Sequence, residues 1–151
     1  MRKLCLLASA AIALVAAAAP KVPDLSLYLG KYPFDSVKGI SFLRHPRVRS
    51  VVTANAPVGM SRWLLGESTA TPIGRKGRLI LSYACEPHNC GPHNWTIVLG
   101  SGALGAICHY DSEISEEAVW FIQKKAVLRT ANGCPSADQP LPPLIVARLQ
   151  G

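Results

Sequence analysis

Residues 79–99 read LILSYACEPHNCGPHNWTIVL, and this stretch decides the fold. Its two ends, residues 79–84 and 95–99, are short apolar runs of the kind that form β-strands, and a loop joins them. Within the loop, Cys85 and Cys90 are separated by four residues, which is not the Cys-x-x-Cys spacing of a redox-active dithiol and fits poorly with a structural zinc knuckle. The pattern therefore predicts two antiparallel strands that present a rigid loop closed by a disulfide.

The N-terminus indicates the oxidising compartment that such a disulfide needs. Two basic residues precede an apolar run over residues 4–15, and four alanines follow it. A charged start, an apolar middle and a small-residue end are typical of a secretory signal peptide. We expect residues 1–18 to be a signal peptide cut after Ala18, and residues 19–151 to form one soluble, exported domain.

The charge of the chain is basic. It has 16 basic and 9 acidic side chains, and two of the basic ones, Arg2 and Lys3, lie in the expected signal peptide, so the remaining net charge is +5. We expect no nucleic-acid partner, because the charges are scattered without an interleaved aromatic stripe. An anionic envelope surface and a plain solvated basic face both stay open as explanations. No later apolar stretch approaches the roughly 20 residues of a membrane span, so we expect none.

Four cysteines follow the expected signal peptide, namely Cys85, Cys90, Cys108 and Cys134. They formally allow three pairings, and a bridged loop selects Cys85–Cys90 together with Cys108–Cys134. By chain entropy, closing the larger loop is worth about 3.5 kcal/mol and closing the smaller one about 2 kcal/mol. We expect the larger bridge to stabilise the fold and the smaller one to pre-organise the loop for binding.

The rest of the chain favours an α+β class with an antiparallel sheet. A helix is expected over residues 46–54, because Pro46 suits a first helical position and apolar residues follow at helical spacing. Residues 60–65 predict a short turn. Residues 115–125 carry both helix and strand signals, and we assign them to a strand. The remaining expected elements are strands over 104–110, 127–129 and 144–149, a hairpin turn at 75–77 and a turn or edge segment over 140–143.

The loop sequence Cys85-Glu86-Pro87-His88-Asn89-Cys90-Gly91 resembles that of the inhibitor of vertebrate lysozyme family, usually called Ivy. The resemblance implies a central antiparallel β-sheet with helices packed at its side and a protruding disulfide loop. It also implies a periplasmic protein of a Gram-negative bacterium that has no enzymatic activity and no cofactor, and that inserts this loop into the cleft of a c-type lysozyme. His88 matches the central histidine of the family, and the expected target-binding residues are Glu86, Pro87, His88, Asn89 and Gly91.

The chemistry of the loop suits this role. A c-type lysozyme cleaves its substrate with two carboxyl groups that flank the scissile bond. An imidazole has nitrogens on opposite sides of a flat ring, so His88 could bridge the two groups with charge-assisted hydrogen bonds. Pro87 restricts the backbone before the histidine, and Gly91 is expected to let the chain leave the loop sharply.

Two loop positions differ from the family's usual Cys-Lys-Pro-His-Asp-Cys, because Glu86 replaces the lysine and Asn89 replaces the aspartate. At about 6–8 Å and an effective dielectric near 20, each contact of Glu86 with a target carboxylate would cost about 2–3 kcal/mol. A net positive charge would also slow the encounter with a basic lysozyme. An alternative target is therefore another muramidase, such as the host's own lytic transglycosylases, whose clefts rely on one catalytic carboxylic acid.

Three further interpretations stay open. The small disulfide could be a plain stabilising hairpin bridge with no partner. An envelope metal-binding protein would need reduced thiols; its candidate ligands are Cys85, His88, Cys90, His93, Cys108 and His109. A hydrolase is the weakest interpretation, because no Gly-x-Ser-x-Gly or His-Glu-x-x-His occurs and the acidic residues between 111 and 117 are typical of a solvated turn. The chain could be a monomer or a homodimer.

The remaining histidines and tryptophans are expected to be structural. His45 precedes Pro46 and marks an element boundary, and His109 lies within a strand. We expect Trp63, Trp95 and Trp120 to belong to the core.

Overall fold

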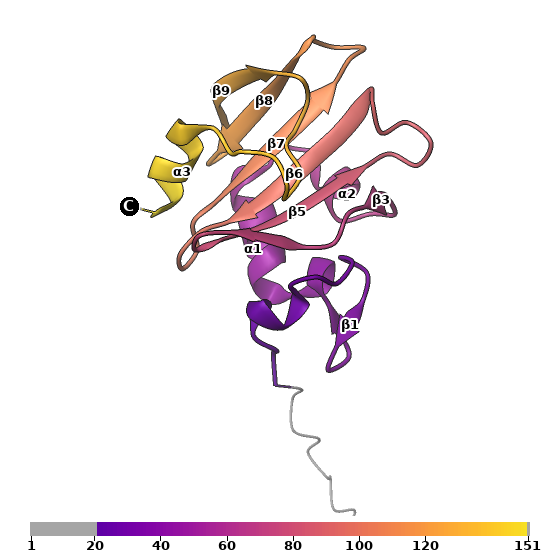
Figure 1. Ribbon diagram of the computed structural model, residues 1–151, viewed down its shortest axis with the longest axis vertical. Helices are drawn as coiled ribbons and strands as arrows, with labels where there is room; N and C mark the ends of the chain where they lie inside the picture. The colour runs from indigo at the N-terminus through magenta and orange to yellow at the C-terminus, as the bar shows by residue number, and fades with distance from the viewer. Residues whose placement is uncertain (1–20, 151) are drawn as a thin grey trace, which may run out of the picture.

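The computed structural model describes residues 21–150, and its main feature is an antiparallel sheet of seven strands (Figure 1). The expected signal peptide at residues 1–18 lies outside the described residues. The strands follow the spatial order β3-β5-β6-β7-β8-β9, with β4 also paired to β5. This α+β architecture confirms the fold class expected from the sequence. The strands are β3 (Thr69–Ala70), β4 (Gly74–Lys76), β5 (Leu79–Cys85), β6 (His93–Leu99), β7 (Gly105–Asp111), β8 (Glu117–Ile122) and β9 (Lys125–Ala131).

The sheet is covered on both faces, which explains why every residue of β6 is buried. Side chains alternate between the two faces along each strand. One face packs against α1 (Pro46–Asn55) and the N-terminal segment, and its core includes Trp95 and Ile97. The other face packs against α3 (Pro143–Gln150), and its core includes Trp120 and Val98. Figure 1 shows α1 behind the sheet and α3 beside its other face.

Helix α1 begins as the sequence predicted. Pro46 occupies its first turn, and the Nδ1 of His45 accepts a hydrogen bond from the backbone N–H of Arg47 at 3.1 Å. His45 is therefore an N-cap, which fits the expected boundary role. The buried valines of α1 approach the sheet closely at Gly105, where a Cβ would collide with Val51.

Helix α3 corrects one prediction, because residues 144–149 were expected to form a strand. Ile145 and Leu149 are buried against the sheet, whereas Ala147, which would share their face in a strand, is exposed, as expected for one face of a helix. Pro143 suits the first turn of a helix, and the carbonyl of Pro142 accepts from the N–H groups of Ile145 and Val146. A short apolar run does not by itself distinguish a strand from a helix, and the strand assignment was wrong for that reason.

The segment before the sheet contains several short elements besides α1, and two of them, at Phe42–Arg44 and Ser61–Leu64, contact α1. The short elements form a small antiparallel hairpin and three single turns of helix. No helix of residues 21–150 is long and apolar enough to cross a bilayer. The elements are η1 (Leu25–Tyr28), β1 (Ser36–Val37), β2 (Ile40–Ser41), η2 (Phe42–Arg44) and α2 (Ser61–Leu64).

Two of the three tryptophans lie where they were expected. Trp95 and Trp120 are almost completely buried. Trp63, on α2, is 38% exposed and is not a core residue, so its assignment was wrong. Its ring instead lies beside the base of the cysteine loop, against the imidazole of His93 at 5.3 Å between ring centroids.

Candidate functional site

The loop between β5 and β6 is closed by a disulfide between Cys85 and Cys90, which confirms the predicted bridge. Backbone hydrogen bonds tighten it further. The N–H of Glu86 donates to the carbonyl of His93 at 3.1 Å, and the N–H of Asn89 donates to the carbonyl of Glu86 at 3.0 Å. The loop is thus a compact turn fixed at both ends by two neighbouring strands of the sheet.

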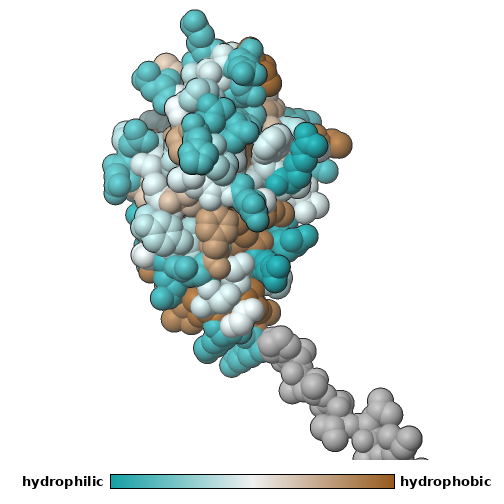
Figure 2. Space-filling model, turned by 90° about the vertical axis from the view of Figure 1, so that its right-hand side faces the viewer, coloured by the Kyte–Doolittle hydropathy of each residue, from teal (hydrophilic) through white to brown (hydrophobic). Residues whose placement is uncertain are grey.

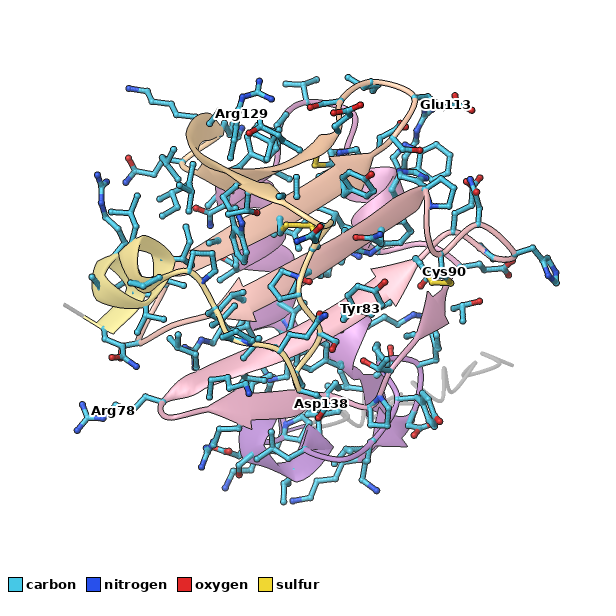
Figure 3. The ribbon with its side chains drawn as sticks, turned by 45° about the horizontal axis from the view of Figure 1, so that its top comes forward. Arg78, Tyr83, Cys90, Glu113, Arg129 and Asp138 are labelled. Carbon is cyan, nitrogen blue, oxygen red and sulfur yellow. A yellow bond between two sulfur atoms is a disulfide. The ribbon has the colours of Figure 1, made fainter. Side chains whose placement is uncertain are left out.

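The tip of this loop is Pro87-His88, and both residues are exposed. His88 has a φ of 63°, in the left-handed region that residues other than glycine rarely adopt. The chain turns at Gly91 as it leaves the loop, but Gly91 is not among the residues of positive φ and a Cβ there would meet nothing within 4 Å, so this turn does not require glycine. Figure 3 shows the loop, marked by Cys90, projecting beyond the end of the sheet.

The carboxylate of Glu86 is bonded within the loop and its base. Its Oε2 accepts from the Nδ2 of Asn89 at 2.7 Å and from the Nδ1 of His93 at 3.3 Å. These two hydrogen bonds, that from Asn89 first, hold the pKa of Glu86 below its usual value. The two positions that differ from the family's usual loop are therefore bonded to one another.

His93 connects the loop to the sheet through a pair of histidines. A carboxylate only accepts hydrogen bonds, so the Nδ1 of His93 donates to Glu86 and the Nε2 of neutral His93 is an acceptor. The Nε2–H of His109 then donates to this nitrogen at 3.0 Å. The imidazole of His93 is nearly buried between the rings of Trp63, Trp95 and His109.

Burial makes His109 hard to protonate. Desolvation lowers the pKa of His109, a protonated His93 would lower it further, and Asp111 opposes both effects. The chain Glu86–His93–His109 is consequently most stable with His109 neutral. The sequence suggested His93 as a candidate metal ligand and His109 as a candidate ligand or a structural strand residue, but it did not predict their contact. A contact between diagonal neighbours on adjacent strands needs the strand register to be known.

Asn94 ties the two disulfides together. Its Nδ2 donates to the carbonyls of Cys90 at 2.9 Å and Gly91 at 3.2 Å, while its Oδ1 accepts from the N–H of Cys134 at 2.9 Å. Cys134 is bonded to Cys108 in β7, as predicted. Asn94 is buried with its amide fully used, so it acts as a structural anchor for the loop.

The loop shares its end of the molecule with two other segments. The N–H of Ser112, in the turn after β7, donates to the carbonyl of Pro92 at 2.9 Å. Val58, Trp63 and Ile114 expose apolar surface around a shallow pocket that reaches His93 and His109. Figure 2 views the molecule from this side and shows hydrophobic residues interspersed with hydrophilic ones.

The geometry bears on the remaining interpretations. All four cysteines of the described residues are in disulfides, so no thiolate is present to bind a metal. Between residues 21 and 150, no group of three or more His, Cys, Asp or Glu side chains is placed to hold a metal ion. Asp111 caps the turn after β7 by accepting from the N–H of Glu113 at 3.0 Å, as expected for a solvated acidic turn.

Comparison with protein-family models, curated proteins and solved structures gave no match. The fold and the site by themselves define an α+β protein that presents a disulfide-closed loop with a histidine at its tip.

Proposed function

We propose that this chain is a periplasmic inhibitor of a c-type lysozyme, which inserts the Cys85–Cys90 loop into the catalytic cleft with His88 at its tip. One observation carries the proposal: an exposed histidine lies at the tip of a disulfide-closed turn at the end of the sheet. The resemblance of the loop motif to the Ivy family supports the choice of target. The protein acts here as a binding partner and performs no chemistry of its own.

The imidazole of His88 suits a cleft that contains two carboxyl groups. Its two nitrogens point in nearly opposite directions, so a protonated ring donates to one carboxylate on each side. Two charge-assisted bonds would hold both groups, and the proton donor of the enzyme would lose the freedom to protonate its substrate. Catalysis stops because the acid and its partner carboxylate are occupied.

The rigidity of the loop favours tight binding. The disulfide, the backbone hydrogen bonds and the two bonds from Asn94 hold the loop in one shape before it meets a partner. A pre-organised loop loses less conformational entropy on docking. The internal bonds of Glu86 also direct its carboxylate toward the loop base, which reduces repulsion with an acidic cleft.

A second candidate target is a lytic transglycosylase of the host cell. The basic charge of the chain favours it, since a net charge of +5 without the first 18 residues would slow the encounter with a basic lysozyme. A cleft with one catalytic carboxylic acid also requires only one hydrogen bond from His88 rather than two.

The test is a titration of the lytic activity of a c-type lysozyme with the purified protein and with its His88→Ala variant. We expect stoichiometric inhibition by the wild type, and a loss of at least about 2 kcal/mol in binding, or about 30-fold, in the variant. The matched control is Gln123→Ala, which removes an exposed side chain from another turn residue of positive φ and should leave inhibition unchanged.

Each outcome has a clear meaning. Equal inhibition by wild type and His88→Ala would contradict insertion of the histidine. No inhibition by folded, fully oxidised protein would direct the same titration to a lytic transglycosylase. Failure against both enzymes would overturn the proposal.

A further inference from the structure

A second site lies at the end of the sheet opposite the cysteine loop. We call it the basic pocket. It is formed by the N-terminal segment, the start of α1, the β4–β5 hairpin and the turn between β6 and β7. In Figure 3, Arg78 and Cys90 mark the two opposite ends. The polar side chains that line the pocket are Asp24, Ser26, Arg47, Arg75, Arg78 and Ser101.

The three arginines come from different segments and differ in exposure. Arg47 is in the first turn of α1, and its Nη2 donates to the carbonyl of Gly100, which fixes the guanidinium at the inner side of the pocket. Arg75 on β4 and Arg78 in the following turn are exposed and approach from the hairpin. One hydrogen-bonded cation and two exposed ones thus surround the same space.

The charge of the pocket is not compensated. Asp24 is the one carboxylate that lines it, and its Oδ1 accepts from the N–H of Ser26 at 2.7 Å. The hydrogen bonds from Ser26 lower the pKa of Asp24, and the charges of Arg47 and Arg75 add smaller effects in the same direction. Within residues 21–150, none of the three guanidinium groups lies within 4 Å of a carboxylate oxygen. Three cations against one anion leave two positive charges available.

We propose that the basic pocket binds a phosphate group. Guanidinium groups match phosphate oxygens with paired, charge-assisted hydrogen bonds, and the hydroxyls of Ser26 and Ser101 can supply further donors. The phosphate can belong to the headgroup of an anionic phospholipid or be free in solution. Bound to a headgroup, the protein would be held at an anionic membrane surface with the cysteine loop directed away from it. This inference does not depend on what the cysteine loop binds.

The probes are sodium phosphate at constant ionic strength and vesicles of phosphatidylcholine with or without phosphatidylglycerol. Binding of phosphate is followed by NMR shifts of the arginine Nε–H groups and of the 99–102 turn. Binding to vesicles is followed by flotation. The test variant is Arg75→Gln with Arg78→Gln. The matched control is Lys125→Gln with Arg129→Gln, which removes two exposed charges from the β8–β9 hairpin.

We expect phosphate to shift the signals of Arg75, Arg78 and the 99–102 turn, and the test variant to bind phosphate about tenfold more weakly than the control. Retention on phosphatidylglycerol vesicles, weakened about 30-fold in the test variant alone, identifies a headgroup as the source. Phosphate shifts without vesicle binding identify free phosphate. Equal losses in both double variants, or no response to either probe, would overturn the site.

Discussion

The side chain of Glu86 decides whether this loop is compatible with an acidic cleft. Its carboxylate accepts hydrogen bonds from Asn89 and His93 within the loop and its base. A loop that read Lys and Asp at these two positions would carry a cation and an anion, whereas this one pairs a carboxylate with an amide and an imidazole. The local bonds replace the missing counter-charge.

Glu86→Gln should therefore not strengthen binding to the proposed target enzyme. If the carboxylate faced a target carboxylate at about 6–8 Å, removing its charge would strengthen binding by about 2–3 kcal/mol. Because the carboxylate is bonded internally, we expect a change of less than about 0.5 kcal/mol, measured by titration calorimetry against the same enzyme. Glu113→Gln is the control, since Glu113 is an exposed carboxylate in the neighbouring turn. A selective gain for Glu86→Gln would show that its charge faces the partner.

His109 should make stability depend on pH. Its pKa is lowered from 6.5 in the folded protein, so the unfolded chain binds more protons as the pH falls. His109 then contributes its full stabilisation above about pH 6.5, and the free energy of unfolding decreases as the pH drops toward the lowered pKa. In His109→Gln this component is absent, and its free energy of unfolding should fall less between about pH 7.5 and pH 5. Urea unfolding at both values measures the two slopes, and identical slopes would contradict a lowered pKa.

At the scale of elements, the β5–β6 loop and its bridge act as one unit. Cys85→Ser with Cys90→Ser removes a constraint that closes six residues and is worth about 2 kcal/mol by chain entropy. The turn keeps its backbone hydrogen bonds and its hydrogen bonds from Asn94. We therefore expect the double substitution to lower the free energy of unfolding by less than it weakens the free energy of binding to the proposed target. Urea unfolding gives the first quantity and the inhibition constant gives the second. A larger loss of stability than of binding would favour a plain stabilising hairpin.

Helix α3 and strand β8 show how elements can be misread. Both segments are short and apolar, and both were assigned to strands. For β8 the assignment was right, because its residues pair with β7 and β9. For α3 it was wrong, because Ile145 and Leu149 are buried while Ala147 between them is exposed, a pattern that a helix gives and a strand does not. The difference comes from the neighbours that each segment meets, and a single sequence does not specify those neighbours.

At the scale of the whole molecule, the Cys108–Cys134 bridge joins the sheet to the segment that leads to α3. Cys108→Ser with Cys134→Ser should lower the free energy of unfolding by about 3.5 kcal/mol, since a closed loop of roughly 27 residues is opened. The control is the same unfolding experiment on the Cys85→Ser, Cys90→Ser variant, which should lose less. A smaller effect for the larger bridge would contradict the entropic account.

The molecule has two differing ends that are joined by a rigid sheet. The cysteine loop lies at one end and the basic pocket at the other (Figure 3). The sheet between them is buried on both faces, so the ends keep a fixed relative orientation. A phosphate bound at one end would leave the loop accessible at the other.

Much of this arrangement follows from local sequence. Pro46 and the valines after it predict α1, the apolar runs on either side of Cys85 and Cys90 predict β5 and β6, and the spacing of the cysteines predicts both bridges. Apart from the Cys108–Cys134 bridge, which follows by elimination once Cys85 pairs with Cys90, these features depend on backbone preference, side-chain periodicity and loop length, all of which act between near neighbours.

Other features required the folded chain. The hydrogen bonds between Glu86 and His93 and between His93 and His109 depend on strand register. The exposure of Trp63 depends on how α2 meets the sheet, and the helical state of 143–150 depends on the face that it covers. The basic pocket likewise gathers arginines that are up to 31 positions apart in sequence. Each of these depends on contacts beyond immediate neighbours in the chain, and their free energy exists only after folding has brought the partners together.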